Sequence, residues 1–467
     1  MGLKMKATPV IAVFDVGKTN KKLFLFDEQY KIVFERSARF LETVDEDGDP
    51  CENLESLRLS IFDSLREVFK NPAFEIKSIN FATYGASFVY IDEHGNPLAP
   101  LYNYLKEYPE ALKDQFYNTY GGEEVFSNLT ASPVLGSLNS GMQLYRIKYE
   151  KPELFARIKY ALHLPQYLSY LISGEAYSDI TSIGCHTNLW DFTKNDYHEW
   201  VRKEGLSDKL APIVPSDSVF PAAFPGNNYA VGPGFHDSSA ALVPYLVNFH
   251  EPFILLSTGT WCISLNPFNS TPLTTEELEN DCLCYLQYEG KPVKASRLFA
   301  GYEHEQQVKR IAAHYNTDVI AYRSVPFDAK IIEELQRMDK VVDLEAHTTI
   351  GLKESPFGSR NLDDYPTDVM AYHQLILDLV NQQYISTNRV LQGTTVKRIF
   401  VDGGFSKNSI FMNLLAAAFP ELEVFAAYMA QATAVGAALA IHKSWNTKPL
   451  PNDIIELKYY AGGTVLH

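Results

Sequence analysis

The sequence has few cysteines, and their spacing forms no paired motif. Its five cysteines, Cys51, Cys185, Cys262, Cys282 and Cys284, are odd in number and include no C-x-x-C pair. A disulfide framework or a zinc ribbon is therefore not predicted. We expect buried thiols in a reducing, cytoplasmic environment.

Long apolar runs and an excess of basic residues are also absent. No stretch approaches the roughly 20 apolar residues of a membrane helix. The first 17 residues lack the small-residue cleavage site of a signal peptide. The formal net charge of −16 disfavours nucleic acid and anionic membranes as partners. These absences favour a small molecule as the partner.

The chain also lacks a G-x-x-x-x-G-K-[ST] motif, which excludes a P-loop protein. What is present is an ordinary globular balance of 46% hydrophobic and 21% charged residues. A chain of 467 residues is too long for one core, so two large or three small domains are expected.

The N-terminal part alternates short apolar runs with polar turns. Three runs in succession predict antiparallel strands that start a sheet. The spacing of Leu54, Leu57, Ile61, Leu65 and Val68 predicts a helix. The strands predicted in this part are Val10–Phe14, Leu23–Phe26, Ile32–Phe34, Ser78–Ala82 and Phe88–Ile91.

The second half of the chain begins like the first. Phe253–Leu256 is an apolar run, Ser257–Thr260 is a small polar turn, and Trp261–Leu265 is a second run. The first half has the same order of strand, glycine-containing turn and strand. This echo suggests an internal duplication and a domain boundary near Val247–Pro252.

The C-terminal third alternates helices with strands, which indicates an α/β domain with some parallel strands. An amphipathic helix passes through Leu375 and Leu379, with Thr367 or Asp368 as its N-cap. A later helix is predicted to be capped by Ser406, and Gly436 to permit close helix packing. The remaining elements predicted here are the strands Arg398–Val401 and Glu423–Phe425 and the helix Ala432–Ile441.

Three turns have the composition of phosphate-binding turns, because glycine and small residues let backbone donors approach an anion. They are Asp15–Lys22, Ser257–Thr260 and Asp402–Asn408. The last enters a helix N-terminus, a favoured place for a nucleotide. Taken singly, each turn is equally consistent with an ordinary hairpin or a tight β–α turn.

Asp237 begins a predicted helix in the segment GFHDSSAA. A carboxylate there is compatible with a simple N-cap. It is also compatible with a general base on a rigid element, and one residue could serve both purposes.

Seven motifs then stand in the order of a known family: DVGKTNKK, TYGASFVYIDEHGNPL, GFHDSSAAL, LLSTGTWCISLNP, FAGYEHE, VDGGFSKN and QATAVGAALA. From about Val10 to about His442 the chain resembles the FGGY carbohydrate kinases, and within them most of all the rhamnulokinase and L-fuculokinase branches. The resemblance implies an α/β fold of two ribonuclease-H-like, actin/hexokinase-type domains with a cleft between them. Residues 8–247 would form the N-terminal sugar-binding FGGY domain and residues 248–467 the C-terminal ATP-binding FGGY domain.

The resemblance also implies roles for individual residues. Asp237 would be the catalytic base, and Asp15 would bind the metal. The cofactor, ATP with Mg²⁺, would be held by Asp15, Gly17, Lys18, Thr19, Lys22, Ser257, Thr258, Gly259, Thr260, Gly403, Gly404, Phe405 and Asn408. The sugar would meet Thr83, Tyr84, Gly85, Phe88, Tyr104, Lys106 and His236.

Departures from the family pattern bear on the substrate. Tyr104 and Lys106 stand where many members carry an Asp and an Arg, and Gln166 and Gln431 stand where acidic residues are expected. The expected reaction is ATP-dependent phosphorylation of a terminal hydroxyl of a ketose, with L-rhamnulose or L-fuculose favoured. The alternatives are a polyol or pentulose kinase, a non-catalytic actin-like ATP-binding protein and a metal-dependent hydrolase; a homodimer is left open.

Overall fold

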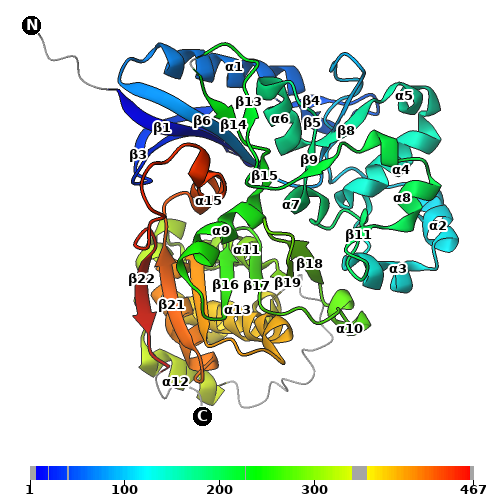
Figure 1. The fold of residues 1–467 in the computed structure, drawn as a ribbon. Coiled ribbons are helices and arrows are strands. Elements are labelled where there is room, and N and C mark those ends of the chain that lie inside the picture. The colour runs from blue at the N-terminus through cyan, green and yellow to red at the C-terminus, as the bar shows by residue number, and fades with distance from the viewer. Residues whose placement is uncertain (1–6, 19, 39–41, 227, 339–354, 463–467) are drawn as a thin grey trace, which may run out of the picture. The chain divides into compact units, whose positions relative to one another are not determined.

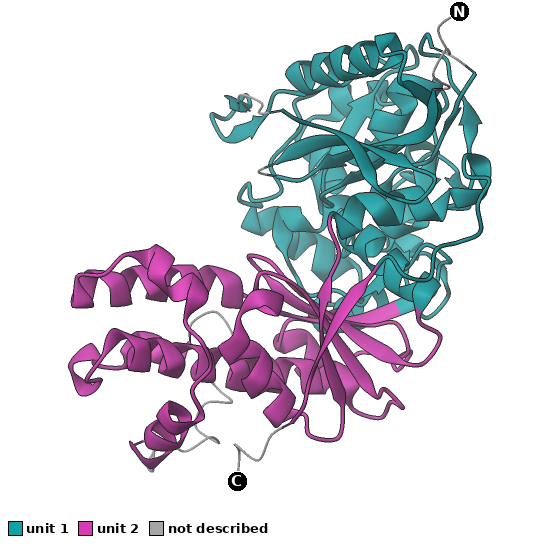
Figure 2. Cartoon of the chain, turned by 90° about the vertical axis from the view of Figure 1, so that its left-hand side faces the viewer, with its two compact units in different colours: residues 1–248, 284–292, 431–454 teal, residues 249–283, 293–430, 455–467 magenta. Residues whose placement is uncertain are grey.

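The computed structural model describes residues 7–18, 20–38, 42–226, 228–338 and 355–462, and the chain divides into two compact units. Unit 1 comprises residues 1–248, 284–292 and 431–454, and unit 2 comprises the rest (Figure 2). The sequence predicted a single division between residues 247 and 248. That division does not account for the two later segments, which belong to unit 1.

The main sheet of unit 1 begins with the three predicted antiparallel strands. β1 (Thr8–Val16) pairs with β2 (Lys21–Asp27), and β2 pairs with β3 (Ile32–Ala38). β6 (Phe74–Thr83) lies parallel to β1 on its other side. The sheet order is β13-β14-β6-β1-β2-β3, with β15 also paired to β6; the short strands are β13 (Phe220–Pro221), β14 (Ala230–Val231) and β15 (Phe235–His236).

Helices cover this sheet, and β1 is therefore buried on both of its faces. Val10–Val13 form a continuous apolar run with no exposed surface, which is typical of a central strand. Alternate β1 residues share one core with apolar residues of α1 (Leu54–Lys70) and α6 (Leu164–Ser173). Helix α15 (Ala432–Ala440) also contacts β1 and β6.

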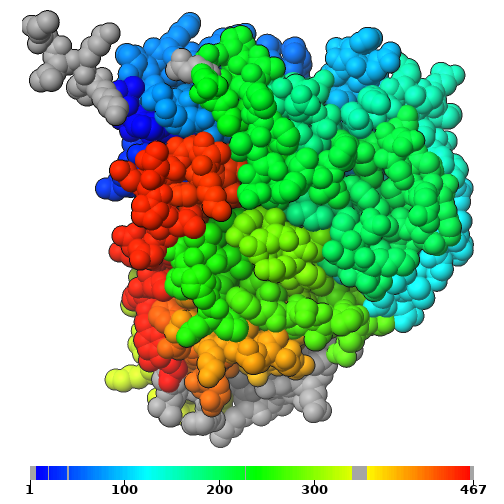
Figure 3. All heavy atoms as spheres, viewed as in Figure 1, coloured from blue at the N-terminus to red at the C-terminus, as the bar shows by residue number. Residues whose placement is uncertain are grey.

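Helix α15 explains why the late segment 431–454 belongs to unit 1. It packs on α9 (Asp237–Asn248), and a Cβ added at Gly436 would lie 1.8 Å from the carbonyl oxygen of Ala240. The glycine therefore allows the two helix backbones to touch, as its position predicted. The red C-terminal segment containing α15 lies beside the blue N-terminal strands (Figures 1 and 3).

The rest of unit 1 is built around a second apolar cluster. Phe116 lies at its centre, in edge contact with the rings of Phe126, Tyr145 and Trp200. The helices here are α2 (Glu110–Thr119), α3 (Glu123–Thr130), α4 (Ser140–Glu150), α5 (Pro152–Arg157), α7 (Ile180–Ile183) and α8 (Glu199–Lys203). The strands are β4 (Glu42–Val44), β5 (Pro50–Glu52), β7 (Phe88–Ile91), β8 (Tyr160–His163), β9 (Ser178–Asp179), β10 (Trp190–Asp191), β11 (Asp196–Tyr197) and β12 (Ile213–Val214).

The second sheet, which lies mainly in unit 2, has the order β18-β19-β17-β16-β20-β21-β22. β16 pairs antiparallel with β17 and parallel with β20, which in turn lies parallel to β21. The strands are β16 (Phe253–Thr258), β17 (Cys262–Asn266), β18 (Cys282–Leu286), β19 (Pro292–Leu298), β20 (Arg398–Gly403), β21 (Glu423–Tyr428) and β22 (Glu456–Tyr460). The helices are α10 (Thr275–Glu279), α11 (Ala300–Tyr315), α12 (Ala329–Met338), α13 (Asp368–Leu391) and α14 (Ser409–Ala418).

The caps of two helices in unit 2 show what the sequence pattern could and could not predict. The predicted helix α13 starts after Thr367, whose side chain accepts a hydrogen bond from the Met370 amide. The prediction that Ser406 caps α14 is wrong. A short 3₁₀ turn, η7 (Phe405–Lys407), comes first, and Asn408 is the N-cap.

All five cysteines are buried, and none of them forms a disulfide in the described chain. In the described parts of the chain, we find no helix with both the length and the apolar character needed to cross a bilayer.

Candidate active site

Three parallel strands of unit 1 end at one edge of its sheet. In the pairing register Val16 of β1 and His236 of β15 both lie opposite Thr83 of β6. Asp15 is the neighbour of Val16, and Asp237 follows His236 as the first residue of α9. The carboxyl ends of parallel strands are where α/β proteins bind ligands, and the predicted residues meet there.

The Asp237 carboxylate is held through one of its two oxygens. Its Oδ1 lies 3.1 Å from Nε2 of His236 and accepts a hydrogen bond of 2.7 Å from the Ser238 amide. The side chain is 34% exposed. Among the described residues, the hydrogen bonds to this carboxylate end on Oδ1, so Oδ2 keeps its lone pairs for a ligand.

His236 is buried behind this carboxylate. Its Nε2 also lies 3.2 Å from Sγ of Cys185, and a Cβ added at Gly85 would come within 3.1 Å of its ring. Burial opposes the imidazolium form, but the charges of Cys185 and Asp237 raise the pKa of His236. Gly85 thus provides the space for an imidazolium that fixes Asp237.

Asp15 carries a charge that the protein compensates poorly. Burial and the charge of Asp237 raise the pKa of Asp15 to about 7, against a smaller lowering by Lys22. The Lys22 ammonium also forms an ion pair with Glu35, at 2.6 Å, so it offsets the charge of Asp15 only in part. A carboxylate in this situation is suited to an added cation.

The turn after β1 contains further predicted residues. The Gly17 amide donates to the Asn20 carbonyl over 2.9 Å and closes the turn. The Lys18 ammonium lies 5.4 and 5.5 Å from the ring centres of Tyr84 and Tyr104. Thr19, predicted for this turn, lies outside the described residues.

The sequence did not single out Glu52, which joins this group. It is 5% exposed, and its carboxylate lies 3.7 Å from the Lys18 ammonium and 3.3 Å from that of Lys21. Tyr84 and Tyr104 lie close together, with ring centres 5.9 Å apart. Glu52 belongs to no local motif, so only the three-dimensional structure places it here.

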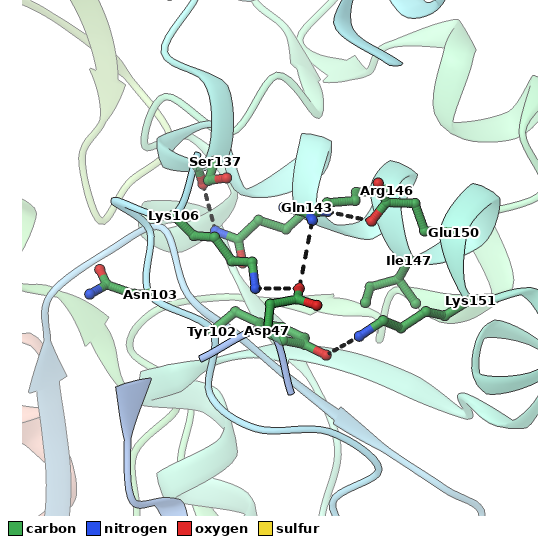
Figure 4. A pocket seen from close by; sticks show the side chains of 10 residues that line it. All are labelled: Asp47, Tyr102, Asn103, Lys106, Ser137, Gln143, Arg146, Ile147, Glu150 and Lys151. Atoms are coloured by element: carbon green, nitrogen blue, oxygen red, sulfur yellow. Dashed lines mark hydrogen bonds and ion pairs between the residues drawn. The ribbon is translucent and has the colours of Figure 1, made fainter. Parts of the chain in front are cut away.

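Two residues predicted to contact sugar have other partners in the structure. The Lys106 ammonium lies 2.6 and 3.0 Å from carboxylate oxygens of Asp45 and Asp49. It also lies 2.7 Å from Asp47, the ion pair drawn in Figure 4. The surrounding space has room for about one water (≈ 20 Å³). Phe88 is buried in an apolar core, with its ring centre 4.1 Å from that of His163.

Gln166, which replaces an expected acidic residue, supports the loop before Asp237. Its side-chain amide is buried and donates to the Gly234 carbonyl over 2.9 Å. Asn80 of β6 accepts from the Gly234 amide over 3.1 Å. These contacts place the start of α9 against the sheet.

In unit 2, two predicted phosphate turns are joined by hydrogen bonds. Thr258 accepts at its carbonyl from the Gly404 amide over 2.8 Å and at its hydroxyl from the Phe405 amide over 3.0 Å. A Cβ added at Gly403 would lie 2.2 Å from the Thr258 carbonyl, and its φ is +93°. Only glycine suits this position, because the strand ends meet there.

A cavity of about 770 Å³ opens beside these turns. Of the predicted residues, Thr258, Gly259, Gly404, Phe405 and Asn408 line it. Ser257, Thr260 and Gly403 belong to the same two turns but are not among the described residues that line it. The volume is in the range of a site for a nucleotide-sized ligand.

The helical wall of this cavity was not predicted from the sequence. Gly301, His304 and Glu305 of α11 and Tyr372 of α13 line it. A Cβ at Gly301 would lie 1.9 Å from the Gly259 carbonyl, so the start of α11 touches the phosphate turn. The motif FAGYEHE was the available signal, but it was used only for the family resemblance.

Unit 1 thus has carboxylates at the end of a parallel-strand edge, and unit 2 has glycine turns beside a nucleotide-sized cavity. These features define the class of two-domain α/β proteins with the actin/hexokinase-type fold. Family models match the FGGY carbohydrate kinase N-terminal domain at residues 10–232 and its C-terminal domain at residues 250–332 and 369–445. The chain belongs to the FGGY family of carbohydrate kinases.

Curated relatives agree with this class. A rhamnulokinase of Mannheimia succiniciproducens is 23% identical over 459 residues, which is 89% of this chain and 86% of the relative. A rhamnulokinase of Halalkalibacterium halodurans is 23% identical over 270 residues, 56% of each chain.

Solved structures share the fold over nearly the whole chain. A carbohydrate kinase from Novosphingobium aromaticivorans has a TM-score of 0.79 at 23% identity, covering 97% of this chain and 94% of its own. A xylulose kinase from Lactobacillus acidophilus has 0.77 at 14%, with the same coverage. Plasmodium falciparum glycerol kinase has 0.74 at 16%, covering 94% and 90%.

Proposed function

We propose that this carbohydrate kinase transfers the γ-phosphoryl group of ATP to a terminal hydroxyl of a ketose. A deoxy-ketose such as L-rhamnulose or L-fuculose is favoured, because two curated relatives are rhamnulokinases. The observation that carries the proposal is the geometry of Asp237. Its Oδ1 is fixed by His236 and a backbone amide, while Oδ2 remains available to a substrate hydroxyl.

In this proposal Asp237 is the general base. Its Oδ2 takes the proton of the sugar hydroxyl as the oxygen forms a bond to the γ-phosphorus. The bond between that phosphorus and the bridging oxygen breaks, and ADP leaves with the electron pair. The imidazolium of His236 keeps the carboxylate oriented and in its charged form.

Asp15 is the residue that would hold Mg²⁺. Its raised pKa shows that a negative charge at this point lacks compensation within the protein, so a divalent cation fits the position. When bound, the ion would neutralise charge on the phosphates of the nucleotide.

The nucleotide would occupy the unit 2 cavity. The turns at Thr258–Gly259 and Gly403–Gly404 would contact phosphates through their backbone. Phe405 and Asn408 would lie nearer the base. Backbone contacts of this kind need no strongly basic surface, which is consistent with the acidic chain.

The sugar contacts are proposed from side chains that lie near Asp237. The charge of Asp237 contributes, after burial, to a raised pKa of Tyr104, which indicates that the two are close. Tyr84 and Lys18 contact Tyr104. We therefore assign the sugar to Tyr84, Tyr104, Lys18, His236 and the backbone near Thr83 and Gly85. Lys106 would act through its ion pairs and Phe88 through packing.

The test is an ADP-release assay with ATP, Mg²⁺ and a panel of acceptors. The panel comprises L-rhamnulose, L-fuculose, D-ribulose, D-xylulose, L-erythrulose and glycerol. We expect the highest kcat/KM with a deoxy-ketose, and a pentulose or glycerol optimum would overturn that preference. Release of phosphate from ATP without any acceptor would indicate a hydrolase, and ATP binding without turnover on any acceptor would indicate a non-catalytic protein.

A further inference from the structure

Three polar side chains from separate helices form a chain along the unit 2 cavity. Asn408 precedes α14, Tyr372 lies on α13 and His304 lies on α11. The Tyr372 hydroxyl lies 2.8 Å from Nδ2 of Asn408 and 3.1 Å from Nε2 of His304. All three residues line the cavity. The inference drawn from them rests on the proposed function, because it concerns the nucleotide.

The orientation of the Asn408 amide is fixed by the backbone of α14. Its Oδ1 accepts hydrogen bonds of 3.0 Å from the amides of Ile410 and Phe411. A flipped amide would direct its NH₂ group at two N–H donors, so that orientation is excluded. Nδ2 therefore donates to Tyr372, and the tyrosine oxygen is an acceptor in this bond.

The Tyr372 proton then has one acceptor. The side chain is 1% exposed, and among the described residues the hydroxyl has hydrogen bonds only to Asn408 and His304. If Nε2 of His304 carried a proton, the tyrosine proton would be buried without a partner, which is costly. Nε2 is therefore the acceptor. Burial also lowers the pKa of His304 to about 4, so the ring is neutral at pH 7.

A neutral histidine with an acceptor at Nε2 carries its proton on Nδ1. Within the described chain, no hydrogen-bond partner is assigned to Nδ1 of His304. The ring of Phe405 lies nearby, with ring centres 5.2 Å apart at 79°. Glu305, Lys309, Arg323 and Lys407 also line the cavity, but the ring that packs against His304 is that of Phe405. A single N–H donor beside an aromatic ring suits a flat heteroaromatic ring with an unprotonated nitrogen.

We propose that His304 recognises the purine base of the nucleotide by donating its Nδ1–H to an unprotonated ring nitrogen. Asn408 and Tyr372 are positioning residues, because they fix the tautomer that makes His304 a donor. A phosphate is a poor occupant of this position, since the ring is uncharged. Purines are favoured because they offer several unprotonated ring nitrogens in a cavity of this size.

The first test measures nucleotide binding calorimetrically with the full chain. Wild type is titrated with ATP and with 1-deaza-, 3-deaza- and 7-deaza-ATP, each lacking one ring nitrogen. One analogue should bind about five- to tenfold more weakly, as expected for one lost hydrogen bond. In His304→Phe, ATP and that analogue should bind equally weakly, whereas His304→Asn should retain part of the preference. His314→Phe, on the exposed part of the same helix, is the matched control.

The second test observes the tautomer directly by ¹⁵N NMR of the histidine ring. Wild type should show a protonated Nδ1 on His304, and Tyr372→Phe should shift the ring toward a mixture with several-fold weaker ATP binding. A protonated Nε2 in wild type overturns the proposal, as does equal binding of ATP and all three analogues. Failure of wild type to bind ATP at all would instead overturn the proposed function. Should His304→Phe not fold, the wild-type measurements decide.

Discussion

Two aspartates of unit 1 differ in how the protein treats their charge. The Asp45 carboxylate is fully buried, lies 2.6 Å from the Lys106 ammonium, and accepts from the amides of Asp47 and Asp49. Burial opposes ionisation of Asp45, but these partners hold its pKa below the ordinary value. Among the described residues Asp15 has no comparable partner, and burial with the charge of Asp237 raises its pKa to about 7.

The difference separates an acidic group with partners inside the protein from one that we propose to be functional. Asp45, Asp47 and Asp49 have the spacing of a cation site, yet a lysine of the same chain fills the centre of the cluster. Because the ammonium already occupies the centre of this cluster, we do not expect a metal ion to bind there. Among the described residues, Asp237 is paired with His236, whereas Lys22 offsets the charge of Asp15 only in part. A substrate-borne Mg²⁺ would relieve this condition at Asp15.

The largest expected effect comes from removing the charge of Asp237, which lies at the same strand edge as Asp15. Asp237→Asn should lower kcat by about 10² to 10⁴-fold, the usual range for a lost general base. It should also lower the pKa of Asp15, because the charge of Asp237 raises it. Turnover is measured by ADP release at saturating sugar and ATP, and nucleotide affinity by calorimetry should change little.

Asp63→Asn is the matched control for this variant, because its side chain is 63% exposed on α1. It should leave both turnover and the pKa of Asp15 as in wild type. Near-normal turnover of Asp237→Asn would remove the residue from its proposed role.

The next effect is a pH-dependent gain of stability in Asp15→Asn. The folded-state pKa of Asp15, about 7, lies above the unfolded value of about 3.9. Between these two pKa values Asp15 is protonated in the folded protein but ionised in the unfolded chain. The free energy of unfolding of the wild type therefore falls as the pH rises toward 7. The variant has no such loss. Its unfolding free energy relative to wild type should rise by roughly 2 kcal/mol from pH 5 to pH 8.

Urea unfolding at several pH values measures this difference. Asp63→Asn serves again as control and should differ from wild type by a constant amount. Parallel curves for Asp15→Asn and wild type would show that Asp15 is ionised throughout. Despite its greater stability, Asp15→Asn should lose turnover and Mg²⁺ dependence.

The sequence predicted the strands near the N-terminus and helix α13 because those elements are determined locally. Apolar runs and the Thr367 cap are features of neighbouring residues. The membership of α15 in unit 1 was not predictable in this way. It depends on contact between Gly436 and Ala240, which are far apart in the chain.

Candidate site residues could be predicted where a motif carries the chemistry. The proposed roles of Asp15, Asp237 and the glycine turns follow from their position at strand ends. Glu52 and His304 were missed, because each gains its surroundings from distant segments. Lys106 was predicted to contact the sugar, but in the structure it is the partner of three carboxylates. That role depends on a hairpin more than fifty residues earlier.

A test of intermediate size would make Asp45 resemble Asp15. Lys106→Met removes the ammonium that three carboxylates share, although Arg146 still lies 3.9 Å from Asp47. The variant should destabilise the fold by about 2 to 3 kcal/mol at pH 7. In wild type, the stability from Asp45 is present above its unfolded pKa and is lost only as pH falls through its lowered folded pKa. In the variant the pKa of Asp45 should rise, and stability should then decrease from pH 5 to pH 8. Lys203→Met, with a 55% exposed side chain, is the control.

The smallest effect should come from Lys22, whose charge lowers the pKa of Asp15. Lys22→Met should raise the pKa of Asp15 by less than about one pH unit, because the ammonium is partly exposed and already paired with Glu35. The carboxyl titration of Asp15, followed by ¹³C NMR, measures this shift, and Lys31→Met on the exposed β2–β3 turn is the control. The pKa of Asp15 could instead rise as much in Lys22→Met as the pKa of Asp45 is expected to rise in Lys106→Met. That result would mean that Lys22 compensates the charge of Asp15 as fully as Lys106 compensates that of Asp45. The difference in pKa between the two aspartates would then reflect burial alone, and it would no longer support a cation-binding role for Asp15.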